Sequence, residues 1–379
     1  MAATGTGTRP GLRRVIKVGT SLLRGSAERP TAAVIADLAA SFGRQQRRGD
    51  QLALVTSGAV GLGCEALHLT RRPTEVVALQ AAAAVGQGRL MALYQDAFAV
   101  RGLQVAQVLL TRGDLASRRR YQNACRTLEQ LLAWGVLPVV NENDTLATDE
   151  LRFGDNDTLS ALVAVAIGAD ELVLLTDVDR LYSGNPRTDA QAQPIEEVRD
   201  LAELERLSHV AGGGGRWGTG GMTTKLAAAR IATSSGIRVR LADGRDPAVL
   251  DLLFAGERVG TVFQPSATPL PDRKRWLAHA LLVKGSVRVD AGAERALLQQ
   301  GASLLAVGIR EVEGEFGRRE AVRVIASDGR ELGRGLSTLS SGELRRIMGL
   351  SSEAVRRELG DVGDAVVHRD ELVLTCPPA

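Results

Sequence analysis

Residues 14–19 read RVIKVG, a short apolar run with one lysine inside it, and five runs of similar length follow in the first two thirds of the chain. Val, Leu and Ile occupy both faces of these runs, which is typical of strands buried in a parallel sheet. The other predicted strands are Gln51–Ser57, Val105–Leu110, Val136–Asn141, Glu171–Asp177 and Ile237–Ala242. Segments with apolar residues at helical spacing lie between them, at Thr31–Gly49, Arg120–Trp134 and Asn156–Ile167. Strands alternating with helices predict an α/β fold around a mainly parallel sheet.

The pattern changes near Leu281. Short strands such as Ser286–Val289 and Ala321–Ile325 are separated by glycines, and helices are predicted at Ala291–Gln299 and Ser341–Met348. This predicts a small β-rich domain. The segment QPSATPLPDRKR, residues 264–275, holds three prolines and is typical of a domain boundary. We therefore expect a disordered tail over residues 1–12, an α/β domain over 13–263, a linker over 264–280 and the β-rich domain over 281–379.

Composition is that of an ordinary globular protein, with 44% apolar and 24% charged residues in a chain of 379. The net charge of +3 is too small to indicate a polyanionic partner. Three scattered cysteines favour a reducing compartment, so we expect a cytoplasmic location. No membrane segment is expected, because the longest apolar run, Ala161–Ala169, ends at Asp170. The first residues contain no apolar stretch of signal-peptide length.

Small polar residues, glycines and one lysine follow four of the predicted strands. They are found in KVGTS (residues 17–21), TSGA (56–59), NEND (141–144) and TD (176–177). Each group alone is explained by ordinary turn chemistry. Ligands of open α/β sheets bind beyond the carboxyl ends of the strands, and four such groups on one edge favour a binding site there.

A glycine-rich stretch, GGGGRWGTGGMTTKLAAAR at residues 212–230, precedes a helix that we expect to begin at Leu226. A flexible linker is one interpretation, and a phosphate site built from backbone N–H groups is the other. Neither common phosphate motif matches. Lys225 lacks the glycine before it and the Ser or Thr after it that a Walker loop needs, and Thr223 stands where a dinucleotide fingerprint needs glycine.

Two lysines remain where a phosphate would bind, Lys17 and Lys225. Phosphoryl transfer depends mostly on positioning and charge neutralisation, so two ammonium groups beside the moving group suit it. The alternative is that both are surface lysines near turns, which suits Lys17 poorly because it interrupts an apolar strand. The segment FGDNDT, residues 153–158, adds carboxylates and an amide at a helix start. Simple N-capping is the alternative there, although one cap would suffice.

Six motifs in this order, IKVGTS, VTSGAVGLG, VNENDT, FGDNDTLSA, LLTDVDRLY and GTGGMTTK, resemble the amino acid kinase family. The later VDAGAERALLQQGASLL and EVEGEF resemble a PUA domain. Together the resemblance covers roughly residues 13–379. It implies an amino acid kinase-like sandwich followed by a small β-rich PUA-like domain. The likeness is greatest to members that phosphorylate the γ-carboxylate of L-glutamate with ATP and Mg²⁺, at the first step of proline biosynthesis.

The resemblance also assigns residue roles. Lys17 and Lys225 would stabilise the transferring phosphoryl group, and Asp157 would hold the two lysines. L-Glutamate would bind Ser57, Asp144 and Asn156. ATP would bind Lys17, Thr176, Asp177, Thr219, Gly220, Gly221, Met222, Thr223, Thr224 and Lys225. Mg²⁺ would be held largely by phosphate oxygens and water, so no protein ligand is assigned to it. The family further implies a homo-oligomer, dimer or tetramer, and proline as a feedback inhibitor acting near residues 141–157.

The residues suit this chemistry independently. A carboxylate is already ionised at neutral pH and needs no general base, and all four histidines lie outside the motifs. Arg180 and Arg319 stand where the two families usually have glycine, so we expect altered local backbone there. Alternatives are a kinase of the same fold with another substrate, a ligand-free flexible loop, or an RNA-binding protein. RNA binding as the main function is disfavoured, because residues 281–379 hold 14 Lys/Arg and 15 Asp/Glu, a net charge of −1.

Overall fold

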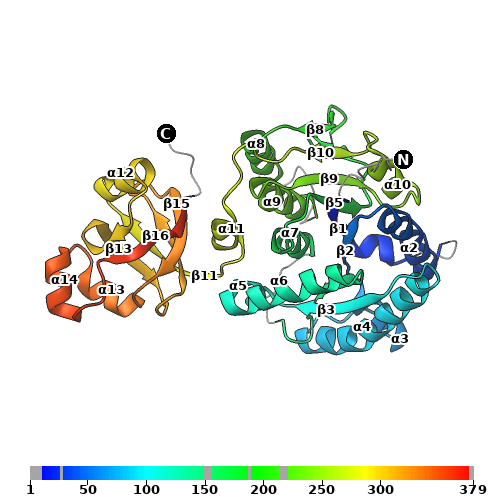
Figure 1. Ribbon diagram of the computed structural model, residues 1–379, viewed down its shortest axis with the longest axis horizontal. Helices are drawn as coiled ribbons and strands as arrows, with labels where there is room; N and C mark the ends of the chain where they lie inside the picture. The colour runs from blue at the N-terminus through cyan, green and yellow to red at the C-terminus, as the bar shows by residue number, and fades with distance from the viewer. Residues whose placement is uncertain (1–10, 26–28, 148–155, 187–188, 213–220, 375–379) are drawn as a thin grey trace, which may run out of the picture. The chain divides into compact units, whose positions relative to one another are not determined.

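The computed structural model describes residues 11–25, 29–147, 156–186, 189–212 and 221–374 (Figure 1). The described chain divides into two compact units, one running to Pro269 and the other starting at Leu270. The segment from Asp272 to His279, inside the range predicted as a linker, forms helix α11 of the second unit. Most of the predicted tail, residues 1–10, lies outside the described residues.

An eight-stranded sheet forms the centre of the first unit, and it is parallel except where β10 runs antiparallel to β9. In spatial order its strands are β3 (Val105–Leu110), β4 (Leu137–Glu142), β2 (Gln51–Val55), β1 (Arg13–Val18), β5 (Glu171–Thr176), β9 (Arg238–Asp243), β10 (Thr261–Phe263) and β8 (Glu197–Val198). Strands β6 (Leu181–Tyr182) and β7 (Pro194–Ile195) form a separate antiparallel pair. All six predicted strands are therefore confirmed, each to within two residues at its ends.

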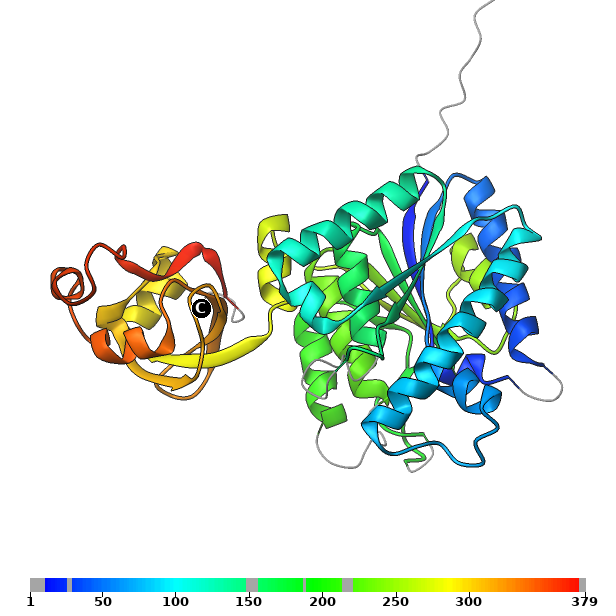
Figure 2. The same cartoon turned by 90° about the horizontal axis from the view of Figure 1, so that it is seen from below.

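Helices cover both faces of this sheet (Figures 1 and 2). Figure 1 shows α7 (Asn156–Ala166) and α9 (Gly221–Ser234) on one side of the strands, and α2 (Thr31–Arg47) and α10 (Val249–Ala255) on the other. The remaining helices of the unit are α1 (Thr20–Leu23), α3 (Ala59–Ala66), α4 (Val76–Ala99), α5 (Arg112–Ala116), α6 (Arg118–Ala133) and α8 (Leu201–Gly212). The predicted sandwich of helices around a mainly parallel sheet is confirmed.

Helix α4 is not indicated by the sequence patterns above, yet it is central to the unit. Its side chains Leu90, Tyr94 and Phe98 are fully buried and join the core beneath α2. Two glycines let α4 approach α3 at backbone distance: a Cβ at Gly63 would lie 1.7 Å from Ala82 O, and one at Gly86 would lie 1.8 Å from Ala59 O. Among the described helices, α4 is the one long and apolar enough to cross a membrane by length and composition. Its buried residues favour a helix of the folded unit instead.

Strand register brings the polar strand ends together. Lys17 in β1 pairs with Val55 of β2 and Leu174 of β5, so the residues after these strands share one edge. Asn141 in β4 extends that edge beside β2, because Thr56 N donates to Val140 O at 2.9 Å. The central strand of the sheet thus carries Lys17 to the carboxyl edge, where ligands of such sheets bind.

The second unit holds a six-stranded sheet with the order β12-β16-β15-β14-β11-β13, in which β11 and β14 are parallel and the other pairs antiparallel. Its elements are α11 (Asp272–His279), β11 (Val283–Val289), α12 (Ala291–Gln300), β12 (Leu304–Leu305), a 3₁₀ turn (Ala306–Gly308), β13 (Ile309–Gly314), β14 (Ala321–Ile325), β15 (Glu331–Ser337), α13 (Ser341–Ile347), α14 (Ser352–Leu359) and β16 (Ala365–Leu374). The β-rich domain is confirmed.

The two unusual arginines differ in backbone conformation. Arg319 has a φ of 64°, in the left-handed region that favours glycine, whereas Arg180 is not among the described non-glycine residues with positive φ. Arg319 is held there by its own N–H, which donates to Ser337 O at 2.6 Å, and by an ion pair with Glu371 at 2.6 Å. The expected local change is therefore a strained residue at Arg319, tolerated because its neighbours hold it.

Candidate active site

Lys17 and Lys225 meet on one carboxylate. Lys17 Nζ lies 2.6 Å from Asp157 Oδ1, and Lys225 Nζ lies 3.2 Å from Asp157 Oδ2. Lys17 extends from the end of β1, Asp157 is the second residue of α7, and Lys225 lies in the first turns of α9. Three segments far apart in sequence therefore converge at the carboxyl edge of the sheet.

Burial makes this cluster electrostatically strong. Asp157 has no exposed surface and Lys17 is only 4% exposed. Charges in such surroundings interact through a lower effective dielectric than in water. Two ammonium groups against one carboxylate leave these three side chains with one net positive charge. This local excess of positive charge would favour an anionic ligand.

The start of α9 points to the same ligand. The helix begins at Gly221, five residues before the expected start at Leu226, so the residues GMTTK form its first turns. Thr224 Oγ1 donates to Asp157 Oδ2 at 2.9 Å, and Lys225 Nζ donates to Gly221 O at 3.0 Å. These contacts hold the first turn against α7, which the sequence pattern did not reveal. The unpaired backbone N–H groups of a helix start favour an anion.

Asn156 and Ser57 lie next to the lysine cluster and contact each other. Asn156 Nδ2 donates to Ser57 Oγ at 2.8 Å, to Thr56 O at 2.6 Å and to Asn141 Oδ1 at 2.9 Å. Asn156 precedes Asp157 in α7, so one helix start positions both a residue of the lysine cluster and an amide beside Ser57. Two of the three residues predicted to bind glutamate therefore come together.

The other predicted residues are placed less closely. Asp144 lies half-buried in the turn after β4, and Thr176 ends β5 with its Oγ1 3.2 Å from Asp177 Oδ1. Met222 is buried within α9, whereas Gly221 and Thr223 are exposed at its start. Thr219 and Gly220 lie outside the described residues, as do residues 153–155 of the FGDNDT motif.

Three further residues support the site: Asn141 belongs to the NEND group noted in the sequence, whereas Gln87 and Tyr94 were not singled out there. Asn141 Nδ2 donates to Gln87 Oε1 at 2.9 Å, which links β4 to α4. Tyr94 shares a hydrogen bond of 2.7 Å with Thr56, directly before Ser57, and burial raises the pKa of Tyr94, which keeps its hydroxyl neutral. The feature of the sequence that could have revealed Gln87 is a polar residue inside an apolar segment, AAAAVGQG.

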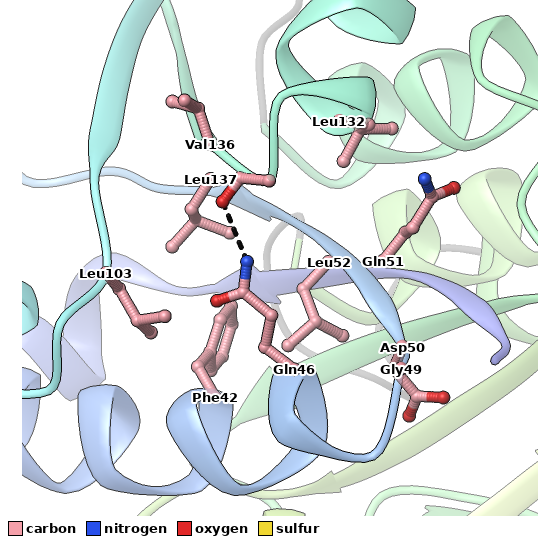
Figure 3. A pocket seen from close by; sticks show the side chains of 11 residues that line it. Phe42, Gln46, Gly49, Asp50, Gln51, Leu52, Leu103, Leu132, Val136 and Leu137 are labelled. Carbon is pink, nitrogen blue, oxygen red and sulfur yellow. Dashed lines mark hydrogen bonds between the residues drawn. The ribbon is translucent and has the colours of Figure 1, made fainter.

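A pocket of ≈ 180 Å³ lies at the opposite edge of the sheet (Figure 3). It is lined where β2 and β4 begin, at Gln51 and Leu137, whereas the lysine cluster lies where strands end. Figure 3 shows Gln46 across the pocket from Leu137, and Gln46 Nε2 donates to Gly135 O at 2.7 Å. The pocket is therefore separate from the lysine cluster and lacks its cationic chemistry.

Comparison with known proteins follows the two units. Residues 13–243 match the Amino acid kinase family, and residues 285–359 match the PUA domain. The first match spans more than half of the chain and includes Lys17, Asp157 and Lys225. The residues that converge in space therefore all lie within one family match.

Curated relatives align over nearly the whole chain. The chain is 61% identical over 360 residues to the Glutamate 5-kinase of Synechococcus sp. (strain CC9902), covering 95% of this chain and 98% of that protein. It is 52% identical over 365 residues to the Glutamate 5-kinase of Acaryochloris marina (strain MBIC 11017), with the same coverage. Among solved structures, carbamate kinase from Giardia lamblia bound to AMP-PNP aligns at 17% identity with a TM-score of 0.49, over 68% of this chain and 99% of that chain. The sequence relatives are thus alike over both units.

Proposed function

This chain belongs to the amino acid kinase family and, within it, to the glutamate 5-kinases. We propose that it transfers the phosphoryl group of ATP at the cluster of Lys17, Asp157 and Lys225. The reaction is the ATP-dependent phosphorylation of the γ-carboxylate of L-glutamate to L-glutamyl 5-phosphate, the first step of proline biosynthesis from glutamate. The observation that carries the proposal is that both lysines bind one buried carboxylate.

Bringing two anions together is the main task of this site. The γ-carboxylate of glutamate has a pKa of about 4.3 and is already a nucleophile at pH 7, so no base has to remove a proton. The phosphates of ATP repel it. Two buried ammonium groups would offset this repulsion and stabilise charge on the phosphoryl group as it moves. Asp157 would keep the two lysines in position without neutralising both.

The nucleotide would bind on the α9 side of the cluster. We assign it to Thr176, Asp177 and residues 219–225, of which Thr219 and Gly220 lie outside the described residues and the rest form the first turns of α9. The exposed start of α9 and Lys225 support this assignment, because both attract phosphate. Lys17 would contact the transferring phosphate from β1.

Glutamate would bind on the Ser57 and Asn156 side. The two side chains already contact each other at 2.8 Å beside the lysine cluster, which supports their joint role. Asp144 would pair with the α-ammonium group, an assignment that rests on charge. Proline would act as a feedback inhibitor on this side, around residues 141–157, because it carries the same type of α-carboxylate and a cationic nitrogen.

Mg²⁺ would enter with ATP and neutralise charge on its phosphates. The described residues include no group of three or more His, Cys, Asp or Glu side chains that could hold a metal ion. Mg²⁺ usually keeps several waters and binds through phosphate oxygens, and we propose that it does so here. We therefore assign no side chain as its ligand.

Assembly and location are inferred from surfaces and thiols. Val77 and Val85 of α4, 75% and 41% exposed, are large apolar side chains at the surface, and we propose that they contribute to a homo-oligomer, dimer or tetramer. Cys64 and Cys125 are free thiols, which supports a reducing, cytoplasmic location. The PUA domain is compatible with RNA binding, but its balanced charge argues against RNA binding as the main function.

Replacing either lysine tests the site. We expect Lys17→Ala and Lys225→Ala each to lower kcat for glutamate phosphorylation by about 10²–10³-fold, the usual effect of removing one preorganised charge partner. The matched control is Lys284→Ala, an exposed lysine of β11 in the second unit, which should keep wild-type turnover. Thermal unfolding should show that all three variants fold. Near-normal turnover in either active-site variant would overturn the two-lysine assignment.

A further inference from the structure

Two buried side-chain atoms near Ser57, on the side where glutamate would bind, have no hydrogen-bond partner in the described part of the chain. They are Gln87 Nε2 and Asn156 Oδ1. Asp157 Oδ1 also lacks a hydrogen bond but is ion-paired with Lys17 at 2.6 Å. Buried polar atoms without partners are few in folded proteins, because losing water without a replacement bond costs more than an ordinary bond gains. Two of them within one connected network therefore indicate a missing ligand.

Backbone groups that contact Asn141 and Asn156 fix the orientation of every amide in this network. Asn141 Oδ1 accepts from Glu142 N at 2.9 Å, and a backbone N–H can only donate, so Asn141 must turn its Nδ2 toward Gln87. Thr56 O accepts from Asn156 Nδ2 at 2.6 Å, and a backbone carbonyl can only accept. Reversing any one amide would place two donors or two acceptors against each other.

The fixed orientations determine what the free ends present. Because Gln87 Oε1 accepts from Asn141, its Nε2 with two N–H groups points away from the network. Because Asn156 Nδ2 is held by Thr56, its Oδ1 points away as an acceptor. One side chain, Asn141, separates these two ends. The network therefore presents a donor at Gln87 and an acceptor at Asn156, the two kinds of group that a polar molecule with both an acceptor and a donor could bind.

The location of Gln87 favours the amino acid as that molecule. Gln80, seven residues earlier and so on the same face of α4, donates to Ala147 O at 3.1 Å. This face of α4 therefore borders the loop that follows β4, where Asp144 lies. The glycine contacts that bring Gly86 against Ala59 place Gln87 next to the turn that follows Ser57.

We propose that Gln87 binds the α-carboxylate of the acceptor amino acid through Nε2, while Asn156 Oδ1 accepts from its α-ammonium group. This inference rests on the proposed function. An α-amino acid carries an acceptor and a donor on one carbon, which matches the donor and acceptor of the network. The γ-carboxylate remains directed to the lysines. Gln87 thus contributes to selection of an α-amino acid over a simple dicarboxylate or amine.

Three Gln87 readouts test the proposal. Gln87→Met removes the donor and should raise KM for glutamate about tenfold, while KM for ATP and kcat stay within about threefold, because the bond is made to an unreacting part of the substrate. Gln87→Glu keeps an acceptor for Asn141 but sets a carboxylate against the α-carboxylate, so its KM should rise further, by about 100-fold. The control Gln46→Met loses a comparable bond, to Gly135 at the opposite edge, and should keep the wild-type KM.

A substrate without the α-carboxylate separates contact from mere positioning. 4-Aminobutanoate keeps the carboxylate to be phosphorylated and the amine, so Gln87→Met should lower kcat/KM for glutamate but not for this substrate. Equal losses for both substrates, or an unchanged KM for glutamate with a water filling the site, would overturn the inference. If the wild-type enzyme is active, Lys17→Ala is inactive and Gln87→Met binds glutamate normally, only this inference fails. Activity of Lys17→Ala would instead contradict the proposed active site.

Discussion

The two edges of the kinase sheet carry two buried charge clusters of opposite character. Lys17 at the carboxyl edge and Arg14 at the amino edge lie three residues apart on the same strand. At the carboxyl edge two lysines share Asp157. At the amino edge Arg14 pairs with Asp50 and with Glu171, and Arg240 pairs with Glu171 at 2.8 Å. The first cluster has two cations and one carboxylate, and the second has two of each.

Charge balance separates a binding cluster from a structural one. The amino-edge cluster is complete, since each cation has a carboxylate and Arg14 also stacks on the Phe254 ring at 4.9 Å. It has no need of a ligand. In the carboxyl-edge cluster two lysines contact one buried carboxylate, an excess of positive charge among these three side chains that would favour an anionic ligand. Similar residue types on one strand are thus found in two arrangements: a pair of lysines on one carboxylate, and two arginines with two carboxylates.

The two edges differ in function only if neutralising a carboxylate lowers kcat at the carboxyl edge and lowers stability at the amino edge. We expect Asp157→Asn to lower kcat by about 10²–10³-fold, because the lysines lose the group that positions them. Glu171→Gln should instead leave kcat of the folded enzyme unchanged but destabilise the protein by about 3 kcal/mol, because two buried guanidinium groups lose their shared partner. Steady-state kinetics and thermal unfolding of both variants provide the measurement, with a Tm decrease of roughly 6–12 °C for Glu171→Gln.

The outcome is informative in either direction. A Glu171→Gln enzyme with strongly reduced kcat in its folded state would show that the amino edge also takes part in function. An Asp157→Asn enzyme with full activity would show that the shared carboxylate is only structural, and the contrast between the edges would disappear.

A smaller effect is expected for Tyr94, and it tests whether the substrate site at the carboxyl edge extends back to Thr56. Tyr94 and Thr56 share a buried hydrogen bond of 2.7 Å one residue before Ser57. Tyr94→Phe should lower the free energy of unfolding by about 1 kcal/mol, the usual worth of one hydrogen bond, and leave kcat and KM within about twofold. Chemical denaturation and glutamate kinetics test this. A large change in KM would extend the substrate site back to Thr56.

The smallest effect is expected where an ion pair is exposed. Arg318, together with the backbone and side chain of Ser340, lowers the pKa of Glu343 to about 2. The folded pKa lies below the unfolded value of about 4.3, so the pair stabilises the protein above that value and the stabilisation is lost as pH falls toward 2. Glu343→Gln should cost about 0.5 kcal/mol at pH 7, because Gln can still close the capping box with Ser340 but loses the charge that pairs with Arg318, and progressively less at pH 4 and pH 3. A difference from wild type that grows on acidification would contradict this sign.

Much of the fold was predictable because short apolar runs between turns are locally distinct. Val105–Leu110 and Ala321–Ile325 were predicted with the bounds that the structure has, since both are short runs rich in Val, Leu and Ile. Helix α4 was not predicted, because alanines and glycines such as Gly86 obscure its periodicity. Those glycines are explained only by the backbone of α3 lying against α4.

The site was partly predictable for a similar reason. Lys17 interrupts an apolar strand, and Lys225 follows a glycine run, so both were visible as unusual residues. The start of α9 at Gly221 was missed, because the contact of Thr224 with Asp157 that anchors it joins segments distant in sequence. Gln87 was missed as a member of the site because a single amide in an apolar segment has no local signature, whereas Asn141 was noted as part of the NEND group without a role of its own.

The sequence by itself determined which chemical groups are available, their order along the chain, and that a parallel sheet would gather several of them at one edge. Only the tertiary structure decided that Lys17 and Lys225 share a carboxylate while Arg14 and Arg240 share another within a balanced set. The reason is physical: electrostatic and hydrogen-bond energies depend on distance and burial. Neither quantity is contained in the separation of two residues along a chain.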